Sequence, residues 1–281
     1  MNISVMKLVV YFLFLLVLPG WSKYPPEIRG ARVETYREID DIALKVWIVG
    51  EKKENEAKPA IVLFFGGAWS FGSPDNLLRH ARYLSQRGMI CLLADYRVAN
   101  RHGVKIADCV EDGKAAVAWT RKNADRLGID SSKIAAGGAS AGGHLAACSA
   151  FVPGFGNEER PDALLLFNPA LILSPFKGED FGYDKRLSAG MVGADPEAIS
   201  PIHHLTEKAP PTWITHGDLD TIVPIKMVKT FRDEMKERGA ICELLVAGFM
   251  PHAFHYRDPW FTKVMSGAER FFESLGWLRR E

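Results

Sequence analysis

Short apolar runs separated by polar turns recur along most of this chain. Most of them are uninterrupted, as expected for strands buried on both faces of a sheet. These runs are Ala60–Phe65, Met89–Ala94, Lys133–Gly137, Ala163–Phe167, Thr212–Thr215 and Ile241–Val246. Two earlier segments, Glu34–Tyr36 and Ala43–Val49, include an alternating apolar pattern and predict a half-buried hairpin.

Helical periodicity fills the intervals between these runs. The clearest case is Asp108–Leu127, where Val110 and Val117 contribute to one apolar face and Gly128 follows as a stop signal. The other predicted helices are Leu77–Arg87, Ala141–Ala150, Ile225–Arg238 and Pro259–Leu275. This alternation predicts an α/β fold with a mostly parallel sheet of about eight strands, helices on both faces, and ligands at the carboxyl ends of the strands.

The first 22 residues have the layout of a secretory signal peptide. Lys7 precedes the apolar run Leu8–Leu18, and Gly20 and Ser22 are small enough for the cleavage-site positions. The run is shorter than the roughly 20 residues that a spanning helix needs. We expect cleavage near Ser22, a secreted or periplasmic product, and no stable membrane insertion afterwards; an uncleaved anchor is the alternative.

The remainder, residues 23–281, is predicted to form a single domain. Its one long irregular segment, residues 174–200, is rich in Gly, Pro, Asp and Ser, which favours a lid or binding loop. The sequence gives no indication of the oligomeric state.

Charge and cysteine content exclude several classes of partner. The formal net charge is +1 and no block of like charges is present, so nucleic acid is not an expected partner. The cysteines lie far apart and without metal-ligand spacing, which predicts buried free thiols, no disulfide and no zinc site. They are Cys91, Cys109, Cys148 and Cys242.

Candidate chemistry begins at Gly138-Ala139-Ser140-Ala141-Gly142, a Gly-x-Ser-x-Gly pattern between a predicted strand and a predicted helix. In that context the serine lies on a sharp turn with its hydroxyl exposed at a helix N-terminus. The positive end of the helix dipole favours the negative charge that develops on an attacked carbonyl oxygen. Ser140 is therefore the predicted nucleophile.

A serine nucleophile needs a base and a carboxylate, and both follow later strands in the order Ser, Asp, His that is typical of α/β-hydrolases. Asp220 follows the strand Thr212–Thr215, and His252 follows the last strand. Asp218 and His255 are the alternatives. We favour Asp220 because it lies further beyond its strand, and His252 because it lies nearer the glycine and proline of its loop.

An oxyanion hole would complete this machinery with backbone amides. Ala141, directly after the nucleophile, is one predicted donor, and Gly67 and Ala68 in the loop after an early strand are the others. Trp69 is a candidate for shaping the acyl pocket, with simple packing as an equal alternative. Asp95-Tyr96-Arg97, at another strand end, is expected to form an ion pair that holds a loop. The remaining histidines, including His144 and His216, are interpreted as structural.

The stretch Gly-Gly-Ala-Ser-Ala-Gly-Gly-His-Leu-Ala at 137–146, together with His216-Gly217-x-x-Asp220, resembles the acetyl esterase and carboxylesterase group of α/β-hydrolases, which is related to the hormone-sensitive-lipase-like esterases. The resemblance covers nearly all of residues 23–281. It implies the α/β-hydrolase fold, the triad Ser140, Asp220 and His252, no cofactor, and short acyl esters as substrates, commonly acetyl groups on sugars or xylan.

One departure from the family pattern concerns the oxyanion loop. The usual His-Gly-Gly-Gly is replaced by Phe65-Gly66-Gly67-Ala68, so an anchoring histidine is absent and one glycine has gained a methyl group. Because the hydrogen-bond donors of an oxyanion hole are backbone amides, activity is expected to survive these changes. The leading hypothesis is a serine esterase acting on a small-molecule or carbohydrate ester; the alternatives are a prolyl-oligopeptidase-like peptidase and a non-catalytic binding protein.

Overall fold

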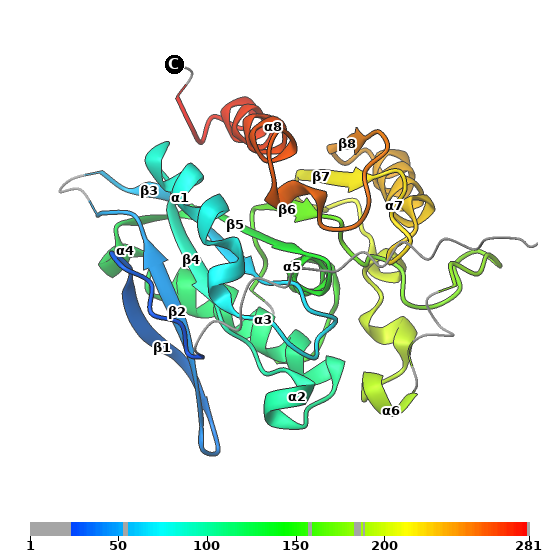
Figure 1. The fold of residues 1–281 in the computed structure, drawn as a ribbon, viewed down its shortest axis with the longest axis horizontal. Helices are drawn as coiled ribbons and strands as arrows, with labels where there is room; N and C mark the ends of the chain where they lie inside the picture. Colours follow the sequence, from blue (N-terminus) through cyan, green and yellow to red (C-terminus); the bar gives the residue numbers. More distant parts are fainter. Residues whose placement is uncertain (1–23, 53–55, 157–158, 183–186, 188, 280–281) are drawn as a thin grey trace, which may run out of the picture.

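The computed structural model describes residues 24–52, 56–156, 159–182, 187 and 189–279. The predicted signal peptide, residues 1–22, lies outside the described residues. Within them, the strands form an eight-stranded sheet (Figure 1). Its spatial order is β1 (Arg32–Ile39), β2 (Ile42–Val49), β4 (Ile90–Ala94), β3 (Lys58–Phe64), β5 (Ile129–Ala139), β6 (Ala163–Phe167), β7 (Thr212–Gly217) and β8 (Cys242–Ala247).

Two pairings are antiparallel, β1 with β2 and β2 with β4, and the pairings from β4 through β8 are parallel. Parallel neighbours bring the carboxyl ends of β3, β5, β6, β7 and β8 to the same edge of the sheet. The loops that carry the predicted site residues all begin at this edge. The predicted α/β-hydrolase architecture is confirmed.

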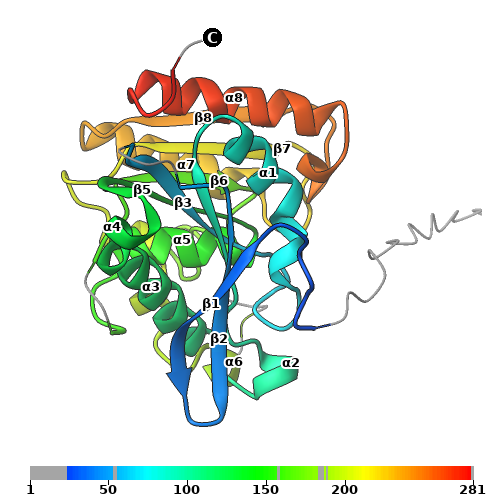
Figure 2. The same ribbon diagram turned by 90° about the vertical axis from the view of Figure 1, so that its left-hand side faces the viewer.

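Helices cover both faces of the sheet. Apolar side chains of α1 (Leu78–Gln86) and α8 (Trp260–Ser274) pack on one face. Those of α3 (Ile106–Lys122), α5 (Ala141–Phe151) and α7 (Ile225–Glu237) pack on the other. Figure 2 shows α3 and α1 on opposite sides of the sheet, with the β1–β2 hairpin in front.

Alternation along the strands explains this arrangement. In β3, Val62 and Phe64 belong to the core beneath α3 and α5, whereas Ile61 and Leu63 belong to the core beneath α1 and α8. Successive side chains of a strand point to opposite faces, so a strand that is covered twice must be apolar throughout. That requirement is why the uninterrupted runs predicted the strands well.

The clearest error lies in the predicted helix Asp108–Leu127. The structure ends α3 at Lys122 and begins the short α4 (Ala124–Leu127) after Asn123. The Asn123 side-chain amide donates to the Trp119 carbonyl oxygen at 2.8 Å and caps the end of α3. The short α2 (Ala99–His102) was not predicted, because four residues carry too little periodicity to be recognised.

Residues 174–200 are described only in part. They include an isolated bridge between Phe176 and Glu179 and the helix α6 (Ala189–Val192). Short 3₁₀ turns follow at Pro196–Ile199 and Pro201–His204. The lid function of this segment stays a prediction.

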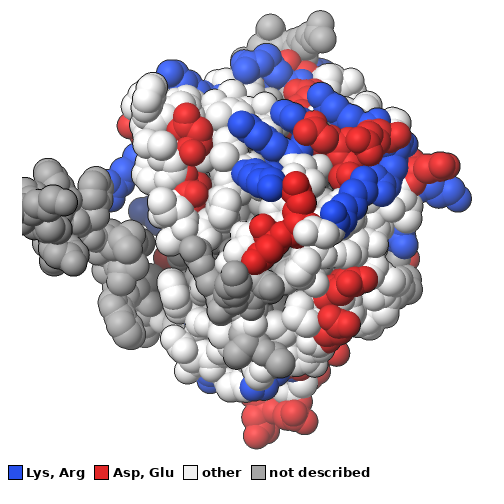
Figure 3. All heavy atoms as spheres, turned by 90° about the vertical axis from the view of Figure 1, so that its right-hand side faces the viewer, with Lys and Arg blue, Asp and Glu red and all other residues white. Residues whose placement is uncertain are grey.

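Surface charge and buried thiols complete the picture. On the face shown in Figure 3, Lys and Arg side chains are interspersed with Asp and Glu. The four cysteines are all buried and free. Among the described helices, none is long and apolar enough to cross a membrane.

Candidate active site

Ser140 occupies the turn between β5 and α5. Its backbone is left-handed, with φ 53° and ψ −116°, and its amide donates to the Phe167 carbonyl oxygen of β6 at 2.9 Å. The side chain is partly exposed, although every residue of α5 behind it is buried. A non-glycine residue pays a steric cost for such a conformation, which persists only where the surroundings fix it.

The glycines that flank Ser140 allow β3 to approach closely. A Cβ added at Gly142 would lie 2.1 Å from the carbonyl oxygen of Phe64, and one at Gly138 would lie 2.6 Å from the same oxygen. Only hydrogen atoms fit in these spaces. The two glycines of the Gly-x-Ser-x-Gly pattern are therefore required by backbone packing, and this packing holds the nucleophile turn in place.

Asp220 and His252 are brought together from the loops after β7 and β8. His252 Nδ1 lies 2.6 Å from Asp220 Oδ2. A carboxylate only accepts hydrogen bonds, so Nδ1 carries a proton, and in the neutral form of the ring the lone pair is therefore on Nε2. That tautomer is the one a general base needs when it receives a proton through Nε2.

Several donors surround the Asp220 carboxylate. Its Oδ1 accepts from the amides of Ile222 and Val223 at 2.9 Å, and its Oδ2 lies 3.2 Å from His216 Nε2. Burial opposes ionisation, but the hydrogen bonds from His216, His252 and the Val223 amide outweigh it and hold the pKa of the Asp220 carboxyl well below its ordinary value. Asp220 is thus a fixed anion beneath the imidazole.

The alternatives weighed from sequence lie elsewhere. Asp218 is exposed, and His255 is fully buried with its Nδ1 3.0 Å from Nε2 of another buried histidine, His80. Geometry therefore favours Asp220 as the carboxylate and His252 as the histidine of the predicted triad.

Two neighbours of the pair were missed by sequence reasoning. His216 was interpreted as structural, yet it contacts Asp220; its position four residues earlier was the available signal. Asn168 follows β6, and its Nδ2 lies 3.3 Å from His252 Nε2. The structure records no hydrogen bond between His252 and Ser140, both of which lie within the described residues.

The predicted oxyanion donors lie beside the nucleophile. Ala141 is the first residue of α5, and a Cβ added at Gly66 would lie 3.4 Å from Ser140 Cβ, so the loop after β3 contacts the turn after β5. Gly67 has φ 142°, and a Cβ there would lie 2.0 Å from the Phe71 carbonyl oxygen. Their role as donors stays a prediction.

The loop is also left-handed at Ala68 and Trp69, with φ 50° and 57°. The Trp69 indole is buried, and its Nε1 donates to His144 Nδ1 at 3.2 Å, while His144 Nε2 lies 2.7 Å from the Ile199 carbonyl oxygen. An indole only donates and a carbonyl only accepts, so His144 is neutral with its proton on Nε2. Burial lowers the pKa of His144 to about 4, which is consistent with that state.

These contacts favour packing over pocket lining for Trp69, although its predicted contact with substrate is untested. They also provide an anchor for the loop in place of the histidine that is missing from its motif. His144 lies on α5 and anchors the loop by accepting the hydrogen bond from the Trp69 side chain. The interpretation of His144 as a buried structural residue agrees with its position.

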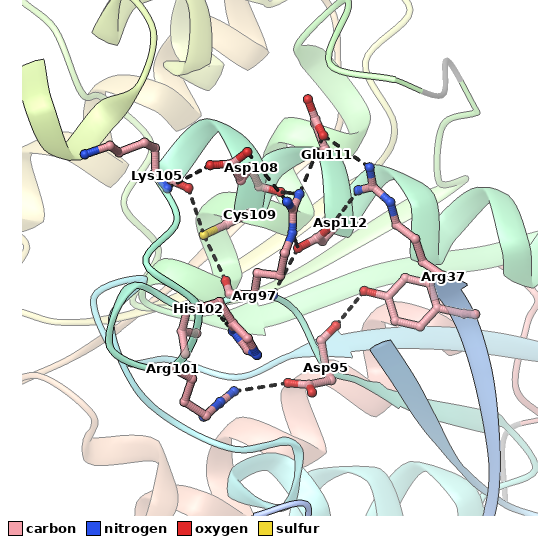
Figure 4. A network of polar contacts seen from close by, with 12 residues as sticks. Arg37, Asp95, Arg97, Arg101, His102, Lys105, Asp108, Cys109, Glu111 and Asp112 are labelled. Atoms are coloured by element: carbon pink, nitrogen blue, oxygen red, sulfur yellow. Dashed lines mark hydrogen bonds and ion pairs between the residues drawn. The ribbon is translucent and has the colours of Figure 1, made fainter. Parts of the chain in front are cut away.

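The strand end at Asp95-Tyr96-Arg97 forms the ion pairs expected there (Figure 4). Arg97 Nε lies 2.8 Å from Asp112 Oδ2, and Arg101 Nη2 lies 3.3 Å from Asp95 Oδ1. Arg101 also donates to the Gly72 carbonyl oxygen at 2.6 Å, which ties this network to the end of the oxyanion loop. The Tyr96 hydroxyl donates to the Phe65 carbonyl oxygen at 2.8 Å.

Several known proteins that are similar to this chain are named as esterases. The BD-FAE family model matches residues 47–161. Esterase LipC of Mycobacterium tuberculosis is 31% identical over 253 residues, a match that covers 78% of this chain and 60% of LipC. The chain thus spans less than two thirds of the length of that curated relative.

Solved structures extend the similarity over both chains. The native Est2 esterase of the Planctomycetes species Thermogutta terrifontis has 39% identity and a TM-score of 0.87, covering 93% of this chain and 98% of that chain. Its propionate-bound form has 39% identity and a TM-score of 0.86, covering 92% and 99%. With this identity over nearly the whole of both chains, the protein belongs to the carboxylesterases of the α/β-hydrolase fold, in the group related to hormone-sensitive-lipase-like esterases.

Proposed function

We propose that this chain is a serine carboxylesterase in which Ser140 is the nucleophile, His252 the general base and Asp220 the carboxylate that orients it. The observation that carries the proposal is the 2.6 Å contact between His252 Nδ1 and Asp220 Oδ2 at the sheet edge where Ser140 lies on its strained turn. The similarity to named esterases supports the same reaction.

The mechanism follows from the proton positions. Ser140 Oγ attacks the ester carbonyl carbon as its proton passes to His252 Nε2, and the resulting imidazolium is stabilised by the Asp220 anion. The tetrahedral intermediate then collapses, the alcohol leaves with the proton from Nε2, and the acyl group remains on Oγ. Water, deprotonated by His252, releases the acid by the same two steps.

Negative charge on the carbonyl oxygen is stabilised, in this proposal, by the amides of Ala141, Gly67 and Ala68. Two of these residues belong to a loop that contacts the serine turn, and the third begins α5. A donor preset at this position typically contributes about a hundredfold to a thousandfold in rate.

The finer proposal concerns the substrate. We infer short acyl esters, acetyl above all, with acetylated carbohydrate such as xylan as a natural source. Support comes from the family resemblance of residues 137–146 and from the propionate-bound state of the similar Thermogutta esterase. Rates on p-nitrophenyl esters of graded chain length, measured beside acetate release from acetylated xylan, test this; a maximum at long acyl chains would contradict it.

Export is a separate proposal. Residues 1–22 are proposed to be a signal peptide, on the strength of the basic residue, the short apolar run and the small residues that follow. Mass spectrometry of the N-terminus after expression in a secreting host is the test. A mature chain that still begins at Met1 would contradict it.

The direct test of the chemistry is Ser140→Ala. Loss of a triad nucleophile typically costs about a millionfold in rate, so hydrolysis of p-nitrophenyl acetate should fall to background while the folded state is retained. Unchanged hydrolysis would disprove the mechanism.

A further inference from the structure

Asn168 lies between the elements that carry the proposed nucleophile, Ser140, and the proposed base, His252. It follows β6 directly, and its backbone amide donates to the Thr215 carbonyl oxygen of β7 at 2.8 Å. The preceding residue, Phe167, accepts the Ser140 amide. Asn168 is therefore hydrogen-bonded to the strand that leads to Asp220, and the residue before it is hydrogen-bonded to the serine turn.

The Asn168 backbone is unusual for a residue with a side chain. Its φ is 38°, and the residue is 1% exposed. Asparagine tolerates the left-handed region better than most residues, but glycine would do so at lower cost. The presence of a side chain at this strained position calls for a contribution from its amide.

That amide contacts the reacting atom of the base. Asn168 Nδ2 lies 3.3 Å from His252 Nε2. Because His252 Nδ1 is bound to the Asp220 carboxylate, Nε2 of the neutral ring is an acceptor, and the Asn168 amide donates to it. Nε2 is the atom that receives the serine proton in the proposed reaction.

The other end of the amide has no partner within the described residues. Asn168 Oδ1 is buried and accepts no hydrogen bond. An unsatisfied buried acceptor is destabilising, so its retention calls for an explanation in another state of the site. When Nε2 becomes protonated it turns into a donor, and a half-turn of the amide would present Oδ1 to it.

We propose that Asn168 is a positioning residue for His252, with an amide that donates to the neutral ring and accepts from the protonated ring. The inference rests on the proposed esterase function. In the resting site the amide holds the imidazole, and the Ser140 hydroxyl replaces it on Nε2 when the substrate arrives. After proton transfer, Oδ1 accepts from Nε2–H until the proton passes to the leaving alkoxide.

Two variants separate this role from packing. Asn168→Asp keeps the shape but offers only acceptors, so it favours the protonated ring. Asn168→Gly removes the amide and relieves the strained backbone, so it should fold. Other groups face the ring as well: the Asp220 anion, with His216 behind it, and His255 from the same loop. These groups are identical in both variants and in the wild type.

The expected results differ between the variants. In Asn168→Asp the acid limb of the kcat/KM profile moves to higher pH by about one unit or more, as for a carboxylate placed beside a base. In Asn168→Gly kcat falls by about tenfold or more, with little change in KM, because the base is less well aligned. Asn123→Asp is the matched control, since that amide caps α3 outside the site, and its pH profile should equal that of the wild type.

Each outcome decides the matter. An Asn168→Asp acid limb that coincides with the wild type, or a wild-type kcat in Asn168→Gly, would overturn the positioning role and leave the esterase proposal intact. A wild-type protein that hydrolyses no ester and does not react with an organophosphonate would overturn both.

Discussion

The serine turn and the oxyanion loop lie in contact, yet the contacts that hold them in place differ in part. The turn depends on close approach of backbone atoms, since Gly138 and Gly142 leave room only for hydrogen atoms against β3. The loop also contains crowded glycines, since a Cβ at Gly67 would lie 2.0 Å from the Phe71 carbonyl oxygen, but in addition it is hydrogen-bonded by side chains of other elements. Trp69 is bound by His144, and Gly72 by Arg101.

The difference determines how each part fails. Adding one methyl group at a crowded glycine is expected to disrupt either part, whereas the loop is also expected to lose its alignment when a side-chain hydrogen bond is removed. Both contain non-glycine residues in the left-handed region, so each stores strain that its surroundings must balance. Substitutions of each kind test the comparison.

The largest expected effect concerns His252, the proposed general base. Asp220→Asn should reduce kcat by about ten-thousandfold, because an amide in place of the carboxylate favours the wrong tautomer of His252. Asp218→Asn, on the exposed neighbour, should leave kcat unchanged. Steady-state kinetics on p-nitrophenyl acetate measure both, and equal losses would count against the assignment of Asp220.

Gly142→Ala is expected to disrupt the turn. The new Cβ would meet the carbonyl oxygens of Phe64 and Phe65 at 2.1 and 2.4 Å, and neither belongs to a flexible side chain. We expect a loss of about 3 kcal/mol or more in the free energy of unfolding, measured by urea titration. Gly248→Ala, where a Cβ would meet nothing within 4 Å, is the control; similar losses in both would refute the backbone account.

Trp69→Phe is expected to loosen the loop. It keeps an aromatic ring but removes the donor to His144, so kcat should fall by about tenfold as the oxyanion donors lose alignment. Trp47→Phe is the matched control, since the buried indole of Trp47, on β2, donates to the Pro26 carbonyl oxygen at 3.1 Å. Both variants should lose similar stability. A kcat loss of the same size in both would contradict the anchoring role.

We expect acid to destabilise the loop by protonating His144, which accepts the hydrogen bond from Trp69. The backbone contacts of the serine turn do not titrate. Burial lowers the pKa of His144 to about 4 and that of His80 to about 3, and it holds the pKa of His255 well below its ordinary value. Below pH 6.5 the unfolded chain binds protons that the folded chain does not. Stability from these groups is therefore complete above pH 6.5 and falls toward pH 4.

Within that window, each such histidine lowers the free energy of unfolding by about 1.4 kcal/mol for each unit by which the pH falls. His144→Asn keeps an acceptor for Trp69 and removes one titrating group, so its stability should fall less steeply with acid than that of the wild type. Urea titrations at pH 7, 6 and 5 measure the slopes. Identical slopes would mean that His144 does not titrate as proposed.

Sequence patterns predicted the fold well, because a strand covered on both faces must be apolar at every position, and Val62 and Leu63 illustrate this on opposite faces. They also indicated Ser140, Asp220 and His252 as candidates, since each follows a predicted strand, and the structure brings His252 and Asp220 into contact. The break at Asn123 was missed because a side-chain cap, and no change of periodicity, ends α3 there.

Contacts between residues at the ends of different strands could not be predicted from the sequence. Asn168 and His252 are 84 positions apart, and Trp69 and His144 are 75 apart. Nothing in the local pattern of either residue indicates its partner, because each pair forms only when the sheet brings separate loops to one edge. The proposed triad could be predicted from a motif and its order, whereas Asn168, the residue proposed to position its base, is recognised only from the tertiary structure.

The central claim is that Ser140 is the nucleophile, and covalent labelling tests it most directly. The protein is treated with a fluorophosphonate probe, residual hydrolysis of p-nitrophenyl acetate is followed, and the modified peptide is identified by mass spectrometry. We predict a single label per chain, on Ser140, with activity lost in proportion to labelling and no label in Ser140→Ala. Labelling of another residue, or full activity in a protein labelled at Ser140, would contradict it.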